Sequence, residues 1–439
     1  MLDVAIVGGG ASGLYAAYLL RKKGLDVHVI EGAPRLGGRL YTIHTPEGHP
    51  IDLGGQWIGP QHSRLLKWIH AHGIPVHRTY TAGANLLITQ KQRRRYKGTI
   101  PKLSWIELLD LAQGLSRLKK MAHQIELTAP WKISRPIWDG ISLAGWMRKA
   151  FITQQAREVF SVGLSTVLGC EPAEVSLWHV LFYIRSAGSL EALIETEGGA
   201  QELKFSHGAT TFIESLGRQV SWETGQIVRA ISWKANRVCV RTTSKAYDAR
   251  VVLLAMPPAG IKGIEFNPPL PPNHAQLAQR MPMGSITKVV AIFDKPFWRE
   301  EGLSGHVLRL EGALRLTFDT SPEDGSYGQI TGFGVGKVAR SLLSRPHEEI
   351  QAYYDMEIRR IFGHSPRWLY CKSWADEPLV GGCYAGFFPP GGWGYFGESL
   401  YQPIPPLYWA GTERATTWMG YIEGAMAAAE HAVQLISQS

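Results

Sequence analysis

The chain has 439 residues, of which 45% are hydrophobic, 10% aromatic and 19% charged, which excludes disorder, a collagen-like repeat and a small disulfide-stapled scaffold. At about 150 residues per domain, this length predicts two or three domains. The formal net charge is +9, and the one dense basic run covers residues 91–97. We expect a solvated turn or hairpin loop there; the alternative is that the run binds a polyanion such as nucleic acid or an anionic membrane.

The cysteines and the N-terminus bear on the compartment. Four cysteines, at positions 170, 239, 371 and 383, form no CxxC pair, so the sequence indicates neither a metal site nor a disulfide framework. The first residues lack the basic and apolar regions of a secretory signal, and no apolar stretch approaches a membrane-spanning length. We therefore expect a soluble, cytoplasmic protein without integral membrane contact, and with no nucleic-acid partner because no module of that kind accompanies the basic run.

The N-terminus carries the pattern of a nucleotide-binding unit. Residues 4–7 are all apolar, as in a buried parallel strand, and the glycines of a GxGxxG motif follow at once. Gly8 allows the tight turn, Gly10 lets the backbone approach a pyrophosphate, and Gly13 permits close packing of helix and strand. A helix is expected over 14–23, with its N-terminus facing the phosphates.

The next segment extends this pattern toward a flavin nucleotide. A second strand, 27–30, ends at Glu31, whose carboxylate can accept hydrogen bonds from a ribose diol. Residues 32–39, with paired glycines and flanking arginines, resemble the extended adenine-dinucleotide signature of flavoproteins, and residues 52–57 resemble the next flavin-contacting segment. The cofactor-binding residues expected in this half are Gly8, Gly10, Ser12, Gly13, Glu31, Arg35, Gly38, Arg39, Gly54, Gly55 and Gln56.

The C-terminal segment is expected to complete the cofactor site. Residues 407–410 read as a strand, 411–413 as a turn, and an alanine-rich helix over about 420–436 points its N-terminus back to that turn. A helix N-terminus there would stabilise the negative charge of a reduced flavin. Taken alone, this segment is better explained by a C-terminal helix that only packs on the sheet.

Several motifs together resemble the monoamine oxidase family over essentially the whole chain. The C-terminal segments are residues 381–384, 388–391, 409–413 and 418–425, and earlier segments that match in order are 198–205, 283–288 and 295–298. The resemblance implies FAD bonded covalently to Cys383 through its 8α carbon, an amine held between Tyr384 and Tyr421, and Lys288 contacting flavin N5 through a water.

Further residues follow from the same matches. Those expected at the cofactor are Val228, near the adenine, and Gly411, Thr412, Gly420 and Tyr421. Those expected in the substrate pocket are Gln201, Ile194, Leu316, Phe333 and Trp374.

The order of predicted elements gives the fold class and the domains. Strands around 227–256 return the chain to the nucleotide sheet, and the inserted stretches are mostly helical at 104–205 and strand-containing at 288–378. We expect an α/β protein with a Rossmann-like FAD-binding domain and an α+β substrate-binding domain that contains a mixed or antiparallel sheet and helices. The first comprises residues 1–80, 206–287 and 379–439; the second comprises residues 81–205 and 288–378.

The resemblance implies FAD-dependent oxidative deamination of an amine, most simply a primary arylalkyl or alkyl monoamine, to imine and then aldehyde and ammonia. The amine and O2 are the expected partners, with hydrogen peroxide as product. An L-amino-acid oxidase is an alternative that needs an arginine for the carboxylate, and Arg315 is the one candidate, although an outward-pointing strand residue is expected there. A polyamine oxidase would need a carboxylate deep in the cavity, which the sequence does not locate. A non-catalytic flavin-binding scaffold is the remaining alternative, and a homodimer is compatible with the sequence.

Overall fold

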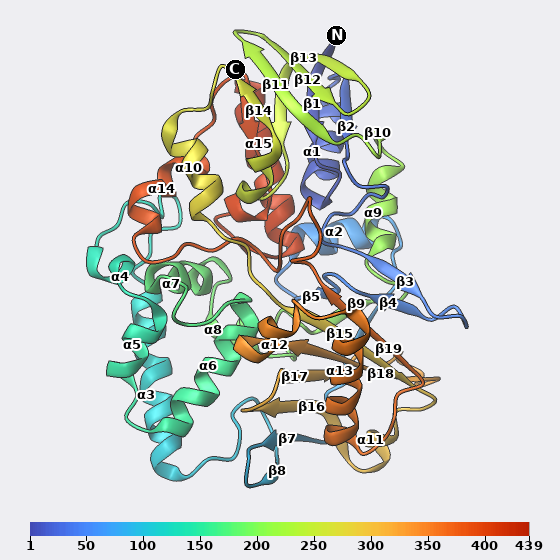
Figure 1. Cartoon of the computed structure of the whole chain (residues 1–439), viewed down its shortest axis with the longest axis vertical. Helices are drawn as coiled ribbons and strands as arrows, with labels where there is room; N and C mark the ends of the chain where they lie inside the picture. Colours follow the sequence, from blue (N-terminus) through green and yellow to red (C-terminus); the bar gives the residue numbers. More distant parts are fainter. Residues whose placement is uncertain (439) are drawn as a thin grey trace.

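In a computed structural model, which describes residues 1–438, the chain is organised around two large β-sheets (Figure 1). The first has the strand order β10-β2-β1-β13-β12-β11-β14, with β20 also paired to β13. Its strands are β1 (Leu2–Val7), β2 (Val27–Ile30), β10 (Ser221–Glu223), β11 (Val228–Lys234), β12 (Arg237–Thr242), β13 (Ala246–Leu254), β14 (Glu265–Asn267) and β20 (Leu407–Trp409). The pairs β10·β2, β2·β1, β1·β13 and β13·β20 are parallel, which confirms the Rossmann-like sheet.

Two helices from opposite ends of the chain pack together on this sheet. They are α1 (Ala11–Lys22) and α15 (Ile422–Gln438), and the view in Figure 1 places them side by side behind the strands. The Gly420 N–H donates to Thr412 Oγ1 over 2.7 Å, and Thr412 Oγ1 donates to the Tyr421 carbonyl over 3.0 Å. The N-terminus of α15 therefore lies against the turn after β20, as predicted.

The second sheet has the order β19-β15-β18-β17-β16-β7-β8. Its strands are β7 (Ala84–Ile88), β8 (Arg93–Tyr96), β15 (Thr287–Phe293), β16 (Leu303–Arg309), β17 (Leu314–Asp319), β18 (Gly328–Gly334) and β19 (Trp368–Ser373). Its pairings are antiparallel except for the parallel pair β16·β7, so the predicted mixed sheet is confirmed. The expectation of a loop for residues 91–97 was wrong in part, because residues 93–96 form strand β8 and pair with β7.

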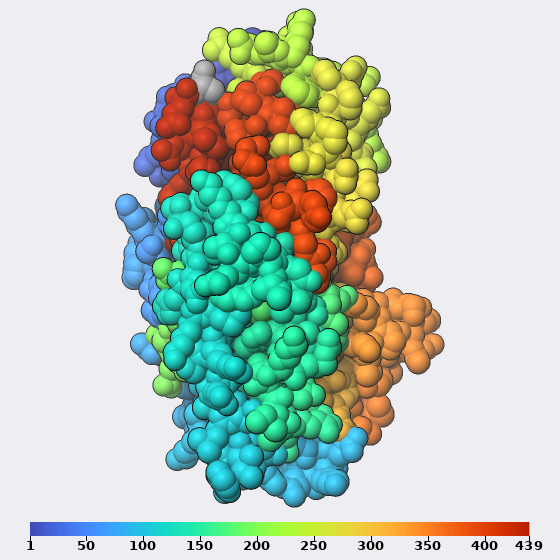
Figure 2. All heavy atoms as spheres, turned by 90° about the vertical axis from the view of Figure 1, so that its left-hand side faces the viewer, coloured from blue at the N-terminus to red at the C-terminus, as the bar shows by residue number. Residues whose placement is uncertain are grey.

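The helices between residues 105 and 194 form a lobe on one side of the two sheets (Figure 1). The helical lobe, which faces the viewer in Figure 2, is formed by α3 (Trp105–Ala122), α4 (Pro136–Gly140), α5 (Leu143–Ala150), α6 (Gln154–Leu168), α7 (Leu177–Ser186) and α8 (Leu190–Ile194). The remaining helices are α2 (Ser63–Ala71), α9 (Thr210–Gly217), α10 (Pro272–Arg280), α11 (Phe297–Glu300), α12 (Gly336–Leu342), α13 (His347–Phe362) and α14 (Gly392–Tyr401). Short strands form two further sheets, with the orders β3-β4 and β5-β9-β6. They are β3 (Thr42–His44), β4 (Pro50–Asp52), β5 (Trp57–Ile58), β6 (Val76–Arg78) and β9 (Leu203–Phe205).

Each large sheet is assembled from segments that are far apart in the sequence. The boundaries assigned above to the two discontinuous domains remain a prediction. Within residues 1–438, no helix combines the length and the apolar character that crossing a bilayer requires.

Candidate active site

One cavity of about 1580 Å³ connects the glycine-rich turn before α1 with the second sheet and the helical lobe. Pockets for drug-sized ligands occupy about 300–1,000 Å³, so this cavity can hold a ligand larger than those. All the predicted site residues except Gly13 line it, which brings together side chains from the first 60 residues and the last 60.

The three glycines of the first turn differ in what they do. Gly8 has φ +111°, and a Cβ on it would lie 2.6 Å from the Ala255 carbonyl oxygen; a Cβ on Gly13 would lie 1.9 Å from the Gly8 oxygen. These two glycines are required by the packing of the protein itself. A Cβ on Gly10 would meet no described atom nearer than 3.9 Å, yet Gly10 lines the cavity. Glycine at this position leaves room for a ligand to approach the backbone.

The N-terminus of α1 is suited to bind an anion. Residues 11–14 include no Asp or Glu, and within the described chain no side chain caps the helix at Gly10. The first-turn N–H groups and the positive end of the helix dipole are therefore available to a phosphate. Ser12 is held nearby, where its Oγ accepts a 3.0 Å hydrogen bond from the Gly411 N–H.

Glu31 is fixed at the cavity wall by backbone groups. Its Oε2 accepts from the Gly9 N–H over 2.6 Å, and its Oε1 accepts from the Ala33 N–H over 2.7 Å. Burial raises the pKa of Glu31, and these two hydrogen bonds oppose that rise. The carboxylate therefore faces the cavity in one orientation, at the position where a ribose diol is expected.

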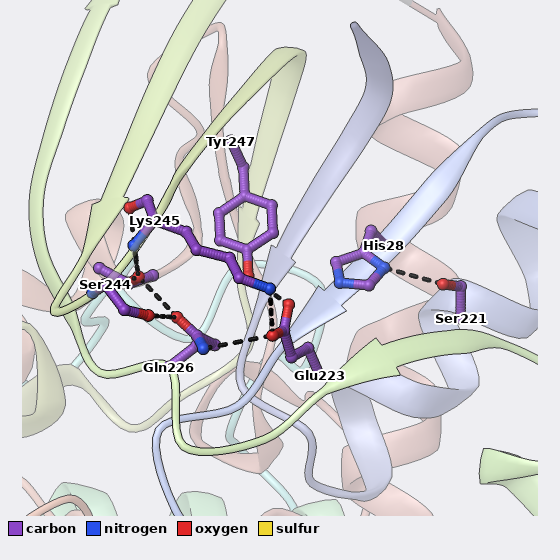
Figure 3. A network of polar contacts seen from close by, with 8 residues as sticks. His28, Ser221, Glu223, Gln226, Ser244, Lys245 and Tyr247 are labelled. Carbon is purple, nitrogen blue, oxygen red and sulfur yellow. Dashed lines mark hydrogen bonds and ion pairs between the residues drawn. The ribbon is translucent and has the colours of Figure 1, made fainter.

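Figure 3 shows a polar network around Glu223 and Gln226, two residues whose main chains bond that of Glu31. The Glu31 N–H donates to the Glu223 carbonyl over 2.9 Å, and the Gln226 N–H donates to the Glu31 carbonyl over 2.8 Å. The Glu223 carboxylate accepts from Lys245 Nζ and from the Tyr247 hydroxyl, and these bonds hold the pKa of Glu223 below its usual value. Lys245 and Tyr247, which do not line the cavity, thus anchor the Glu223 side chain, while the backbone of Glu223 and Gln226 positions Glu31.

Both predicted arginines of the second glycine segment line the cavity but are already bonded to the protein. The Arg35 guanidinium donates to the carbonyls of Leu36, Gly38 and Leu40, so it shapes the turn that contains the paired glycines. Arg39 donates to the Glu413 carboxylate and to the Tyr384 carbonyl, each over 2.6 Å.

Lys288 lies on β15 and is 5% exposed. Its Nζ donates to the Gly54 carbonyl over 2.8 Å and to Gln56 Oε1 over 2.6 Å. Burial lowers the pKa of Lys288 to about 7, although the nearby Asp52 opposes the shift. Gln56 Nε2 and Trp57 Nε1, on residues that also line the cavity, are buried donors that find no acceptor within residues 1–438. A bound polar ring system would supply acceptors for them.

Cys383, Tyr384 and Tyr421 line the same part of the cavity. Burial raises the pKa of both phenols above the usual tyrosine value, so both stay neutral. The Tyr384 ring packs edge-on to Phe333 at 6.0 Å, and the Tyr421 ring lies 6.2 Å from that of Tyr183. These contacts surround the region with aromatic faces.

All four cysteines lie in the described part of the chain, and Cys383 alone lines the cavity. Burial raises the pKa of its thiol to about 12, and the neighbouring cations Arg39 and Lys288 oppose the rise. A Cβ on Gly284 would lie 2.3 Å from the Cys383 carbonyl oxygen, so glycine there lets the two segments pack closely. The other three thiols are core or partly buried residues.

The five predicted substrate-pocket residues, Gln201, Ile194, Leu316, Phe333 and Trp374, all line the cavity. Arg315 does not. Its guanidinium donates to the carbonyls of Gly312 and Leu310 at the turn between β16 and β17, so it neither reaches the cavity nor points freely outward. The residue that the amino-acid oxidase alternative relied on is therefore unavailable to a substrate carboxylate.

Several residues that line the cavity were not predicted from the sequence. Tyr183 of α7, one face of α6 and residues 98–101 all contribute. Glu195 and Glu197 also line it, although the sequence located no carboxylate there. The two acids lie just before segment 198–205. The match of that segment to the family was the feature of the sequence that could have pointed to them. Helix α6 gave no signal, because apolar residues occupy several of its faces.

Comparisons with known proteins all point to one protein family. A model of the family described as flavin containing amine oxidoreductase matches residues 11–437. The flavin-containing amine oxidase of Danio rerio is 34% identical over 443 residues, covering 98% of this chain and 84% of that protein. Cyclohexylamine oxidase from Brevibacterium oxydans superposes with a TM-score of 0.94 at 27% identity, covering 100% of this chain and 99% of that one. Putrescine oxidase bound to putrescine gives a TM-score of 0.94 at 26% identity, with the same coverage.

The hydrogen bonds of Glu223 predict that this residue affects the affinity for the cofactor although its side chain does not contact the cofactor. Glu223→Ala removes the acceptor for Lys245 and Tyr247, so residues 223–226 hold Glu31 less firmly, and the Kd for FAD should rise about tenfold. The measurement is a flavin fluorescence titration in a Cys383→Ala background, where a covalent link cannot mask weaker binding. Ser221→Ala, which removes only the bond to His28 from the same strand, is the control and should change Kd less than about twofold. Equal affinities for both variants would contradict the role given to Glu223.

Proposed function

The chain belongs to the flavin-containing amine oxidoreductase family, and on that premise we propose that it is a monoamine oxidase acting on primary arylalkyl or alkyl amines. FAD-dependent amine oxidation, with O2 as the second substrate, is the chemistry of the family. The products proposed are the imine, which hydrolyses to aldehyde and ammonia, and hydrogen peroxide.

The residues present fit FAD. Gly10 leaves backbone open to a ligand, the start of α1 offers unpaired N–H groups, and Gln56 Nε2 and Trp57 Nε1 are buried donors that lack an acceptor. We propose that Glu31 and Val228 hold the adenosine half, and that Thr412, Gly420 and Lys288 lie at the ring system. When bound, FAD supplies the two-electron oxidation of the amine and returns the electrons to O2.

The observation that carries the monoamine proposal is the neutralisation of Arg39, the arginine whose guanidinium contacts Tyr384. Arg39 is neutralised by the buried carboxylate of Glu413, with which it forms an ion pair at 2.6 Å. The phenols of Tyr384 and Tyr421 stay neutral, and Lys288 is bonded to Gly54 and Gln56. Such a site favours a neutral amine with an apolar substituent and disfavours a substrate that brings a carboxylate.

Within this site the protein's part is to bind and orient. The aromatic faces of Tyr384 and Tyr421 attract the nitrogen of the amine, while the surrounding apolar wall excludes water. Lys288 Nζ, with a pKa of about 7, can hold a proton or a water molecule beside Gln56 at neutral pH. No other side chain is required to act as a base in this scheme.

A second candidate substrate class is a diamine or polyamine. Glu195 and Glu197 line the cavity, and a carboxylate at some distance from the reacting carbon could bind a second ammonium group. Putrescine oxidase, bound to putrescine, is among the structures that this fold matches. The amino-acid oxidase alternative loses its support, because the Arg315 guanidinium is bonded to backbone carbonyls outside the cavity.

The experiment that tests the proposal is peroxide release from the purified protein with benzylamine, tyramine, putrescine, spermidine and L-amino acids. We expect turnover of the arylalkylamines with kcat/KM at least about tenfold above the rest. Preferred turnover of putrescine, lost in Glu195→Gln, would replace the monoamine proposal with the diamine one. Turnover of L-amino acids alone, or of nothing, would contradict both.

The two tyrosines should act together. Tyr384→Ala with Tyr421→Ala removes both ring faces, so the amine is no longer oriented and kcat/KM should fall about 100-fold or more. Phenylalanine at either position keeps the ring and should retain part of the activity. Steady-state kinetics with benzylamine checks this, and unchanged kinetics in the double alanine variant would refute the assignment.

Lys288 should influence the reaction with oxygen more than the oxidation of the amine. In Lys288→Met, the rate of flavin reoxidation measured by stopped flow should fall about tenfold or more, while flavin reduction changes little. The Lys288 side chain is charged below its pKa of about 7 and neutral above it. The reoxidation rate of the wild-type enzyme should therefore change across that pH, and the rate of the variant should not. Equal reoxidation rates in the two proteins would rule this role out.

We propose that the flavin is bonded to Cys383, because its buried thiol alone among the four lines the cavity. Flavin colour should remain with acid-precipitated wild-type protein and be released from Cys383→Ala. The matched control is Cys371→Ala, a partly buried cysteine that lies outside the cavity and should retain the colour. Release of all flavin from the wild-type protein would exclude the covalent link.

A further inference from the structure

The start of helix α3 exposes an unusual group of large apolar side chains. Trp105 is 70% exposed, Ile106 53% and Leu109 62%. The opposite face of the helix is buried through Leu111 and Leu118, which pack in the core of the helical lobe. The exposed residues therefore have no packing role in the fold, and a helix with an apolar outer face needs an explanation.

This apolar group is held in place. Ser104 and Glu107 form a capping box in which each side chain bonds the backbone of the other residue, so α3 begins firmly at Trp105. The Ile152 N–H donates to the Asp110 carboxylate, so Ile152 lies beside the second turn of α3. Ile152 is a further exposed apolar residue, with 87% of its surface accessible. The exposed side chains thus form a fixed surface on a rigid helix.

Basic residues border the same surface. The run at 91–97 forms the β7–β8 hairpin, and its exposed cations are Lys91, Arg93, Arg95 and Lys97. The Arg94 guanidinium donates to the Lys102 carbonyl over 3.4 Å, which ties the hairpin to the segment that leads into α3. In Figure 1 both the hairpin and the first turn of α3 lie at the lower end of the molecule, and Figure 2 shows this end from the side of the helical lobe. We call the cations of 91–97 with Trp105, Ile106 and Leu109 the α3 patch.

We propose that the α3 patch docks the protein on the surface of an anionic lipid bilayer. An interfacial helix presents Trp, Ile or Leu to the boundary between headgroups and acyl chains, and flanking Lys and Arg bind the anionic headgroups. The α3 patch has both components on neighbouring segments. Helix α3 lies on the surface in this mode, which requires no membrane-spanning helix.

Charge and composition distinguish this occupant from two others. In a symmetric contact with a second copy, the cations of the two hairpins would border the same interface and repel each other. A nucleic acid would be bound by the cations but would gain little from exposed Trp105, Ile106 and Leu109. A lipid surface satisfies both parts of the α3 patch.

The position of the α3 patch also bears on access to the cavity. Residues 98–100 are exposed and also line the cavity, and they connect the basic hairpin to α3. A cavity mouth therefore lies beside the patch, so docking would bring this mouth close to the bilayer surface.

The test is cosedimentation of the full-length holoprotein with vesicles of phosphatidylcholine alone or with about 30% phosphatidylglycerol, at about 50 and 500 mM salt. We expect binding to the anionic vesicles at low salt, at least fivefold weaker on neutral vesicles and weakened by high salt. Trp105→Glu with Leu109→Glu, and separately Arg93→Glu with Arg95→Glu, should each weaken binding about tenfold. All four side chains lie on the surface, and retained flavin absorbance will verify that the variants fold.

Matched controls use residues of the same type elsewhere. Ile137→Glu changes an apolar residue, 68% exposed, on α4, and Arg218→Glu with Lys234→Glu reverses two exposed cations away from the α3 patch. Both controls should bind the anionic vesicles as the wild type does. Failure of the wild type to bind, or equal binding by the α3 patch variants, would overturn the proposal. Binding to duplex DNA without binding to vesicles, or self-association that Trp105→Glu abolishes without vesicle binding, would overturn it in favour of another partner.

Discussion

The buried ion pair between Arg39 and Glu413 joins the parts of the chain on which the candidate site depends. Arg39 ends the second glycine segment, Glu413 follows β20, and the Arg39 guanidinium also donates to the Tyr384 carbonyl. Glu413 is fully buried and also accepts from the Gly386 N–H over 3.2 Å. Burial alone would lower the pKa of Arg39, but the Glu413 carboxylate outweighs it and raises that pKa, so the pair stays ionised. Removing one partner of such a pair typically costs about 3–5 kcal/mol, because the other charge is left buried and unpaired.

This pairing also sets the electrostatic character of the inner cavity. Arg39 is satisfied by Glu413, whereas Glu195 and Glu197, which also line the cavity, form no ion pair among the described residues. Burial lowers the pKa of His306, which lines the cavity, to about 4, so that its imidazole is neutral at physiological pH. Lys288 differs, since its pKa of about 7 leaves it able to change charge in the physiological range. The Arg39–Glu413 pair, the neutral phenols of Tyr384 and Tyr421 and the titratable Lys288 together underlie the proposed substrate class.

Much of the fold and of the candidate site could be predicted from the sequence, because several motifs have a local physical reason. The first turn is an example: Gly8 and Gly13 are demanded by backbone contacts and Gly10 by access to the cavity, and a spacing of glycines records all three. The resemblance then led to Lys288 and to five pocket residues that do line the cavity.

Other features depend on tertiary context that no local pattern reveals. Nothing in the sequence shows that Arg315 bonds the carbonyls of its own turn, or that Tyr183 reaches the cavity from α7. The basic run was read as a loop because its charges suggested solvent exposure, whereas a strand can expose alternate arginines while burying Tyr96.

We have proposed that this cavity oxidises an amine that carries no carboxylate. Phenethylamine and L-phenylalanine differ only by that group, so the most direct measurement is anaerobic mixing of the purified protein with each, followed by its flavin absorbance. We expect phenethylamine to bleach the long-wavelength flavin band and L-phenylalanine to leave it unchanged. Bleaching by L-phenylalanine and not by phenethylamine would contradict the proposal.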